Sequence, residues 1–114
     1  MQKYFMKDKG LYIVHILDAA RDIESFIQGI TLQEFLKDKK LQHAVARNLE
    51  IIGEAAKRLD PEIIKKVDVP WNGIKGMRDK IAHDYFDIDL QIVWKSATED
   101  VPELKKKLLP YNPE

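Results

Sequence analysis

The residues best suited to chemistry lie in one short stretch, residues 77–86, which reads MRDKIAHDYF. Arginine, histidine and tyrosine follow there in the order R-x4-H-x-Y, at Arg78, His83 and Tyr85. Arginine is a permanent cation whose planar donors match phosphate oxygens, histidine titrates near neutral pH, and tyrosine carries a phenol. This combination points to chemistry on phosphodiesters.

Helical geometry separates two of these side chains within one chain. In one straight helix, a rotation of about 100° per residue places His83 roughly 140° around the axis from Arg78, while Tyr85 returns to the arginine's side. Either the helix ends near Asp84 and His83 turns at the frayed end, or a second copy of the chain completes the site. We favour the second arrangement, with some contribution from the first.

The same residues also have a purely structural interpretation. Arg78 could form a surface ion pair with Asp79 or Asp84, His83 could cap a helix end, and the ring of Tyr85 could belong to the core. Spacing alone favours this interpretation, because most charged residues simply solvate a surface.

Two metal interpretations are weaker. His83-Asp84 spells the dipeptide of metal-dependent HD phosphohydrolases, but the chain has only three histidines. His15, Asp18 and Asp22 line one side of a predicted helix, yet only two of them are one turn apart, and the E-x-x-H pair of di-iron bundles is missing from the sequence. We therefore predict neither a metal site nor a cofactor.

A face of the predicted second long helix supplies possible supporting residues. Arg47, Glu50, Glu54 and Arg58 follow one another there, and Glu54 and Arg58 suit an ion pair one turn apart. This face is either a solvated ion-pair surface or a support for the catalytic pair through Arg47 and Glu54. Asn48 lies within the apolar stripe, where an unpaired amide is costly, so we expect it to hydrogen-bond a neighbouring helix or a dimer mate.

Helical periodicity predicts the elements that must position these residues, and no segment alternates long enough to form a convincing strand. Thr31 to Glu34 has the T-x-x-E form of a capping box, and Pro102 should kink the last helix by removing a bond to the carbonyl of Thr98. Short connections favour an antiparallel bundle. Four main helices are predicted, over residues 8–29 or 10–29, 41–59, 71–84 and 90–109, with a short helix near residues 31–37 and a one-turn helix over 61–65.

Composition limits the partners. The chain has 114 residues, enough for one domain, and its 19 basic and 19 acidic residues cancel, so any RNA contact must come from a local patch. It has no cysteine, which is compatible with a reducing cytoplasm. The longest apolar run, residues 11–17, contains His15 and is far shorter than a membrane span. We expect a soluble, cytoplasmic protein.

Together with RNLEIIGEA at residues 47–55 and PWNGI at residues 70–74, the R-x4-H-x-Y motif resembles the HEPN superfamily, specifically the HepT toxins. The similarity extends over nearly the whole chain, through Val93-Trp94 and residues 102–104. It implies a single HEPN (HepT-like) domain over residues 1–114. The implied fold is all-α, an antiparallel four-helix bundle with an additional short helix, assembled as a homodimer.

The resemblance also implies an activity and a partner. The chain would be a metal-independent endoribonuclease toxin acting on RNA rather than DNA, with Arg78 and His83 catalytic. A nucleotidyltransferase antitoxin of the MntA type would silence it by transferring AMP to Tyr85. The alternative is a non-catalytic subunit that presents a nucleotide or substrate to a nucleotidyltransferase, and RNA hydrolysis that depends on His83 separates the two.

Overall fold

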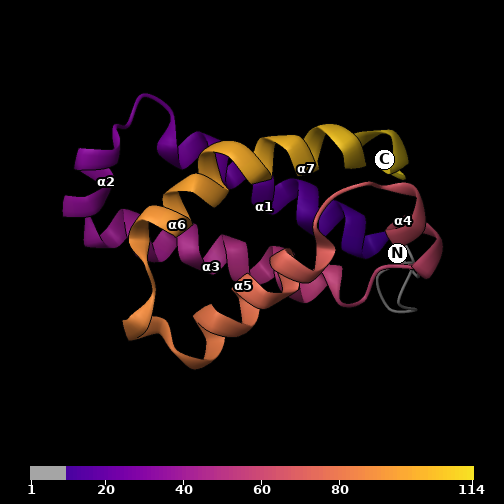
Figure 1. The fold of residues 1–114 in the computed structure, drawn as a ribbon. Helices are drawn as coiled ribbons and strands as arrows, with labels where there is room; N and C mark the ends of the chain where they lie inside the picture. Colours follow the sequence, from indigo (N-terminus) through magenta and orange to yellow (C-terminus); the bar gives the residue numbers. More distant parts are fainter. Residues whose placement is uncertain (1–9) are drawn as a thin grey trace.

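The computed structural model describes residues 10–114, which form helices and turns without a strand (Figure 1). The predicted all-helical class is therefore confirmed for this part of the chain. The longer helices are α1 (Leu11–Ile27), α3 (Lys39–Ala56), α5 (Trp71–His83) and α7 (Val101–Leu108). The shorter ones are α2 (Leu32–Lys37), α4 (Pro61–Lys66) and α6 (Leu90–Lys95).

Side-chain caps fix where α2 and α3 begin. The predicted capping box is confirmed, because Thr31 Oγ1 accepts from the Glu34 N–H at 3.1 Å and Glu34 Oε1 accepts from the Thr31 N–H at 2.9 Å. Asp38 accepts from the N–H of Leu41, and α3 therefore starts at Lys39, two residues earlier than predicted. It ends at Ala56, where tighter turn bonds replace the helical ones before Asp60 caps α4.

The last predicted helix is divided. Between α6 and α7, residues 96–100 form a π turn, in which the Val101 N–H donates to the carbonyl of Ser96. Pro102 follows at once and has no N–H to offer the carbonyl of Thr98. The Thr98 hydroxyl also donates to the carbonyl of Trp94, at 2.8 Å. The proline marks the irregularity, which takes the form of a widened turn.

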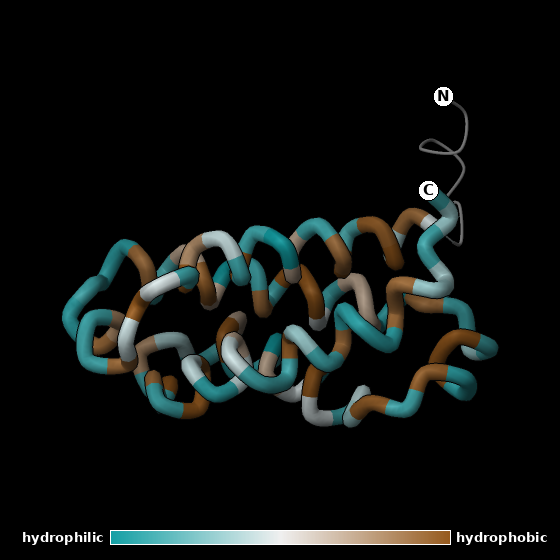
Figure 2. The backbone as a smooth tube through the Cα atoms, turned by 90° about the horizontal axis from the view of Figure 1, so that it is seen from above, coloured by the Kyte–Doolittle hydropathy of each residue, from teal (hydrophilic) through white to brown (hydrophobic). Residues whose placement is uncertain are grey.

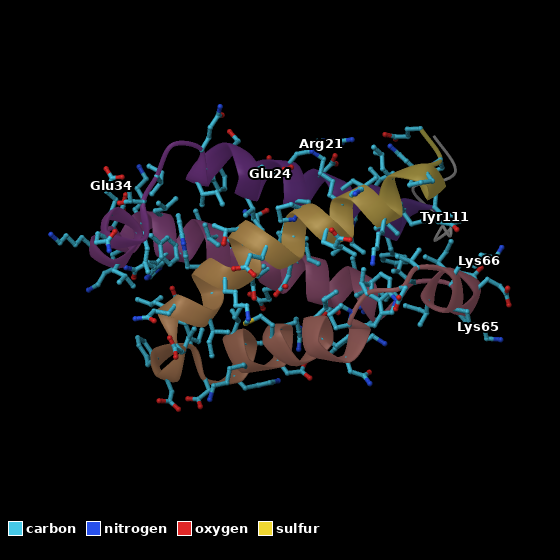
Figure 3. All side chains as sticks on the ribbon, turned by 45° about the horizontal axis from the view of Figure 1, so that its top comes forward. Arg21, Glu24, Glu34, Lys65, Lys66 and Tyr111 are labelled. Atoms are coloured by element: carbon cyan, nitrogen blue, oxygen red, sulfur yellow. The ribbon has the colours of Figure 1, made fainter. Side chains whose placement is uncertain are left out.

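The helices enclose one apolar core. Helix α1 packs against α3 and α7, and α5 packs against α3, while α2 and α4 lie at opposite ends (Figure 1). Apolar and polar residues alternate along the tubes in Figure 2 with the rhythm expected of half-buried helices. An ion pair of 2.7 Å joins Lys105 of α7 to Glu24 of α1, which is labelled in Figure 3. The largest fully buried side chains are Phe35, Ile16, Leu17, Ile23, Leu108, Val45 and Val93.

No helix within residues 10–114 is both long enough and apolar enough to cross a lipid bilayer.

A glycine allows α5 to approach α3 closely. A Cβ atom on Gly53 would overlap with the Cβ of Arg78 and would lie 3.0 Å from the carbonyl oxygen of Ile74. The backbone of α5 therefore lies where a larger residue on α3 would push it away. This approach positions Arg78, because its side chain leaves α5 at the point of contact.

We predict that Gly53→Ala destabilises the fold although alanine is the better helix former. Overpacking costs about 1–3 kcal/mol, and the cost of so close an overlap with backbone and a Cβ atom should exceed a propensity gain of at most roughly 1 kcal/mol. Gly76→Ala is the matched control, because a Cβ there meets no atom within 4 Å, and it should stabilise α5 by about 0.5–1 kcal/mol. Urea unfolding followed by circular dichroism measures both, and equal shifts in the two variants would contradict the close-approach argument.

Candidate active site

Arg78 is held against α3 by two carboxylates. Its Nε lies 2.9 Å from Glu54 Oε2, and its Nη1 donates to Asp79 Oδ1 at 3.2 Å. The Nε atom is buried and its contact with Glu54 is an ion pair without hydrogen-bond alignment. The side chain is 23% exposed, so part of the guanidinium remains open to a ligand.

Both carboxylates are shared with other cations. Arg58 donates to Glu54, and this bond, more than the nearby Arg78, lowers the pKa of the Glu54 carboxyl. Lys57 Nζ lies 2.5 Å from Asp79 Oδ1 and is the main cause of the lowered pKa of Asp79. The two carboxyls therefore stay ionised to a lower pH than an ordinary carboxyl, and Arg78 belongs to a charged network.

This network borders an open groove of about 320 Å³ between α1, α3 and α5. Three arginines and two glutamates contribute to the groove, so positive charge exceeds negative charge among the lining side chains. Arg47 is 67% exposed and pairs only loosely with Glu50, at 3.4 Å. The lining consists of Tyr12, His15, Arg47, Glu50, Ile51, Glu54, Ala55, Arg58 and Arg78.

His83 lies outside this groove. It is the last residue of α5 and is exposed, and its side chain makes no hydrogen bond, ion pair or ring contact with any part of residues 10–114. Because α5 is continuous from Trp71 to His83, the angular separation of about 140° from Arg78 persists. A single copy of the described chain does not bring both side chains to one groove.

Tyr85 begins a 3₁₀ turn directly beyond α5. Its ring is partly buried and meets the ring of His43 edge-on, at 5.2 Å and 75°. Burial raises the pKa of the Tyr85 phenol above its ordinary value. The ring of Phe86 also meets that of Tyr85 edge-on, at 6.0 Å between ring centroids, and is fully exposed.

The three expected supporting residues have different positions. Glu54 contacts Arg78, and Arg47 lines the same groove. Asn48 is buried, but its Nδ2 donates to the carbonyl of Ala44, 2.9 Å away and one turn earlier in α3. Within residues 10–114 this bond to its own helix replaces the expected bond to a neighbouring helix, and the alternative bond to a dimer mate stays a prediction.

Sequence reasoning overlooked Gly53 and His43. An isolated glycine within a helical pattern often marks a close approach of another backbone, and this was the available signal for Gly53. His43 precedes Arg47 by one helical turn and so shares its face, but only the path of the chain beyond α5 brings Tyr85 to it. Two of the residues weighed as metal ligands have different contacts, since His15 lines the groove and Asp18 forms an ion pair with Arg21.

Comparison with known proteins shows which family this chain matches. The model of the family described as "Ribonuclease HepT-like" matches residues 16–110. "Probable ribonuclease HepT" of Thermococcus cleftensis is 45% identical over 98 residues, which cover 84% of this chain and 88% of that protein.

Two further relatives carry the name "Putative RNase". One, from Methanocaldococcus jannaschii, is 44% identical over 103 residues, covering 90% of this chain and 85% of the relative. The other, from Caldanaerobacter subterraneus subsp. tengcongensis, is 41% identical over 104 residues, covering 90% and 93%. No solved structure matches the chain.

We predict that the Glu54 carboxyl titrates below the ordinary range of a glutamic acid and that Arg58→Ala raises its pKa more than Arg78→Ala does. A lowered folded-state pKa stabilises the protein above the unfolded-state value, and this contribution disappears as the pH falls through the folded-state value. The stability difference between the wild type and Glu54→Gln should therefore vanish in acid. Carboxyl-detected NMR titration checks the order of the two arginines, and an unshifted Glu54 would contradict the network.

Proposed function

This chain belongs to the HepT-like ribonuclease family, and from that premise we propose that it is a metal-independent endoribonuclease toxin silenced by AMP transfer to Tyr85. Family membership supports the ribonuclease activity itself. The roles of the site residues, the control by AMP and the assembly are our proposals, and each rests on the geometry described above.

The observation that carries the proposal is the environment of His83. A general acid or base needs a titratable side chain that can reach the substrate and is not already bonded to another group. His83 is exposed and unpartnered among the described residues, in an R-x4-H motif whose arginine is anchored to α3. This arrangement suits proton transfer to and from RNA.

The reaction is internal transesterification. A base removes the proton from a ribose 2′-hydroxyl, the oxygen attacks the adjacent phosphorus, and the bond to the 5′-oxygen breaks as an acid protonates that leaving oxygen. The products are a 2′,3′-cyclic phosphate and a 5′-hydroxyl. Arg78 neutralises the charge that builds on the phosphoryl oxygens.

We propose that two copies of the chain supply this set. One copy offers a single motif histidine, which is turned away from its own Arg78. Two copies related by a two-fold axis offer two histidines, one as base and one as acid, together with two arginines. The site is therefore composite in this proposal, and a monomer would have only half of it.

Modification of Tyr85 would silence the site. The Tyr85 oxygen attacks the α-phosphorus of ATP bound to a nucleotidyltransferase of the MntA type, an O–P bond forms, and pyrophosphate and the phenolic proton leave. The resulting AMP is a bulky anion two residues from His83. It excludes RNA sterically and repels its phosphates.

We predict that His83→Ala and Arg78→Ala each reduce RNA cleavage by about 10²-fold or more, because each removes a group that acts in the transition state. Arg21→Ala is the matched control, since Arg21 is an exposed arginine of α1 paired with Asp18, and it should retain activity (labelled in Figure 3). The assay is run in EDTA with analysis of product ends.

Circular dichroism and sedimentation must show that each variant is a folded dimer like the wild type. Full cleavage by a folded His83→Ala dimer would favour the nucleotide-presenting subunit instead. Activity that is lost in EDTA and restored by a divalent metal would favour metal-dependent chemistry.

We predict that Tyr85→Phe remains an active ribonuclease that the nucleotidyltransferase cannot modify, because the ring and its packing on His43 are kept and only the acceptor oxygen is deleted. Tyr111→Phe, at the far end of the chain, is the control and should still accept AMP (labelled in Figure 3). Intact-mass measurement with ATP, magnesium and the partner detects the transfer. AMP on another residue would contradict the assignment.

A further inference from the structure

The exposed face of α3 carries a row of basic side chains that continues beyond the groove. Lys39, Lys40, His43 and Arg47 fall within a sector of about 100° around the helix axis, and all four are exposed. The row rises about 12 Å from Lys39 to Arg47. Arg47 also lines the groove that holds Arg78, so row and groove are continuous.

The lysines of this row are uncommitted. Lys39 and Lys40 form no ion pair with any of residues 10–114, in contrast to Lys57 and Lys80, which each bind a carboxylate. The nearest acid in sequence, Asp38, uses its side chain to cap α3. In a chain whose net charge is zero, a set of unpaired cations on one face creates a local positive surface.

Aromatic rings join the row to the motif. The edge-on contact between His43 and Tyr85 places the 3₁₀ turn beyond α5 against the first half of α3. Phe86 extends from the same turn and is 102% exposed, which is unusual for so large an apolar side chain. A free aromatic face beside a row of cations is the combination that binds single-stranded nucleic acid, with bases on rings and phosphates on cations.

Acidic neighbours limit where phosphates can lie. Asp84 lies two residues before Phe86 and Asp87 directly after it, and their carboxylates lie 3.0 and 3.4 Å from Lys80 Nζ. This side of the turn is therefore negative or neutral, whereas the α3 side is positive. A strand crossing here would direct its phosphates toward α3 and one base toward Phe86.

We propose that Lys39, Lys40, His43, Arg47 and the ring of Phe86 form a track that binds an unpaired segment of the RNA substrate and leads it to the motif. This inference rests on the proposed ribonuclease function and specifies its substrate, a single strand with at least one splayed base. Phe86 is the stacking platform, and the α3 cations are the phosphate contacts.

The test measures binding of a fluorescent, single-stranded 2′-O-methyl oligoribonucleotide, which has no 2′-hydroxyl and so cannot be cleaved by internal attack. Replacing both Lys39 and Lys40 by alanine should weaken binding and reduce the slope of log K against log salt by about 1.4, since each phosphate contact on a single strand contributes about 0.7. Lys65 and Lys66 are the matched control pair, adjacent lysines on α4 at the opposite end from α2 (Figure 3). Replacing both of them by alanine should change neither quantity.

A second set of variants tests the ring. Phe86→Ala should weaken binding about fivefold or more, Phe86→Trp should retain it, and Phe86→Leu should behave like alanine, because only an aromatic face stacks on a base. Phe26→Ala is the control, as Phe26 is another exposed phenylalanine, on α1. Sedimentation of each variant accompanies the binding curves.

Three results of the binding and sedimentation experiments would overturn the track. The first is an equal salt slope for the Lys39/Lys40 and Lys65/Lys66 double variants, and the second is a wild-type protein that does not bind the probe. The third is a Phe86→Ala variant that no longer self-associates while its RNA affinity is unchanged, because Phe86 would then be a contact between copies. Cleavage of RNA with an unchanged KM in the Lys39/Lys40 variant would also reject the track and leave the ribonuclease intact. Binding through the track by a chain that cleaves no RNA would support the track and reject the proposed function.

Discussion

The contact between Gly53 of α3 and Arg78 of α5 determines the position of everything around the motif. Helix α5 contains two glycines of its own, so its intrinsic helical preference is low and its packing partner must hold it. That partner is α3, with the buried side chains of Trp71 and Ile81 anchoring the two ends of α5. The Trp71 indole N–H also donates to the carbonyl of Val67, at 2.9 Å. With both ends anchored and the middle in backbone contact, α5 cannot rotate to present another residue in place of Arg78.

The charges around Arg78 explain how an already paired arginine can still bind an anion. Arg78, Arg58 and Lys57 share the two carboxylates of Glu54 and Asp79, which leaves one positive charge in excess. A phosphate that approaches this cluster becomes a third acidic partner, and neither carboxylate has to lose all its cations. These pairs are partly exposed, and exposed pairs are weak enough to rearrange at little cost. The network therefore orients the guanidinium without occupying it completely.

Local signals predicted most of the helices, whereas the site depends on contacts that no local signal contains. The capping box at Thr31 was predictable because both of its bonds lie within four residues. Pro102 correctly located an irregularity, but whether the helix kinks or widens into a π turn depends on what packs around it. The predicted bond from Asn48 to a neighbouring helix was wrong for the described residues, because its Nδ2 bonds to its own helix, whereas the alternative bond to a dimer mate stays a prediction. The contact of His43 with Tyr85 joins residues far apart in the chain, so it required the fold.

Both ends of the motif lie against α3, and their separation bears on how modification and catalysis are related. Arg78 meets α3 at Gly53, whereas Tyr85 meets it at His43, ten residues earlier and therefore about 15 Å along the helix. An AMP group on Tyr85 would then lie over the first half of α3, among its unpaired cations, rather than on the guanidinium of Arg78. Its phosphate would satisfy the lysines and its adenine would compete for the exposed ring of Phe86. In this arrangement, the AMP group would block RNA by binding to the lysines and the ring that would otherwise bind the phosphates and a base of the RNA.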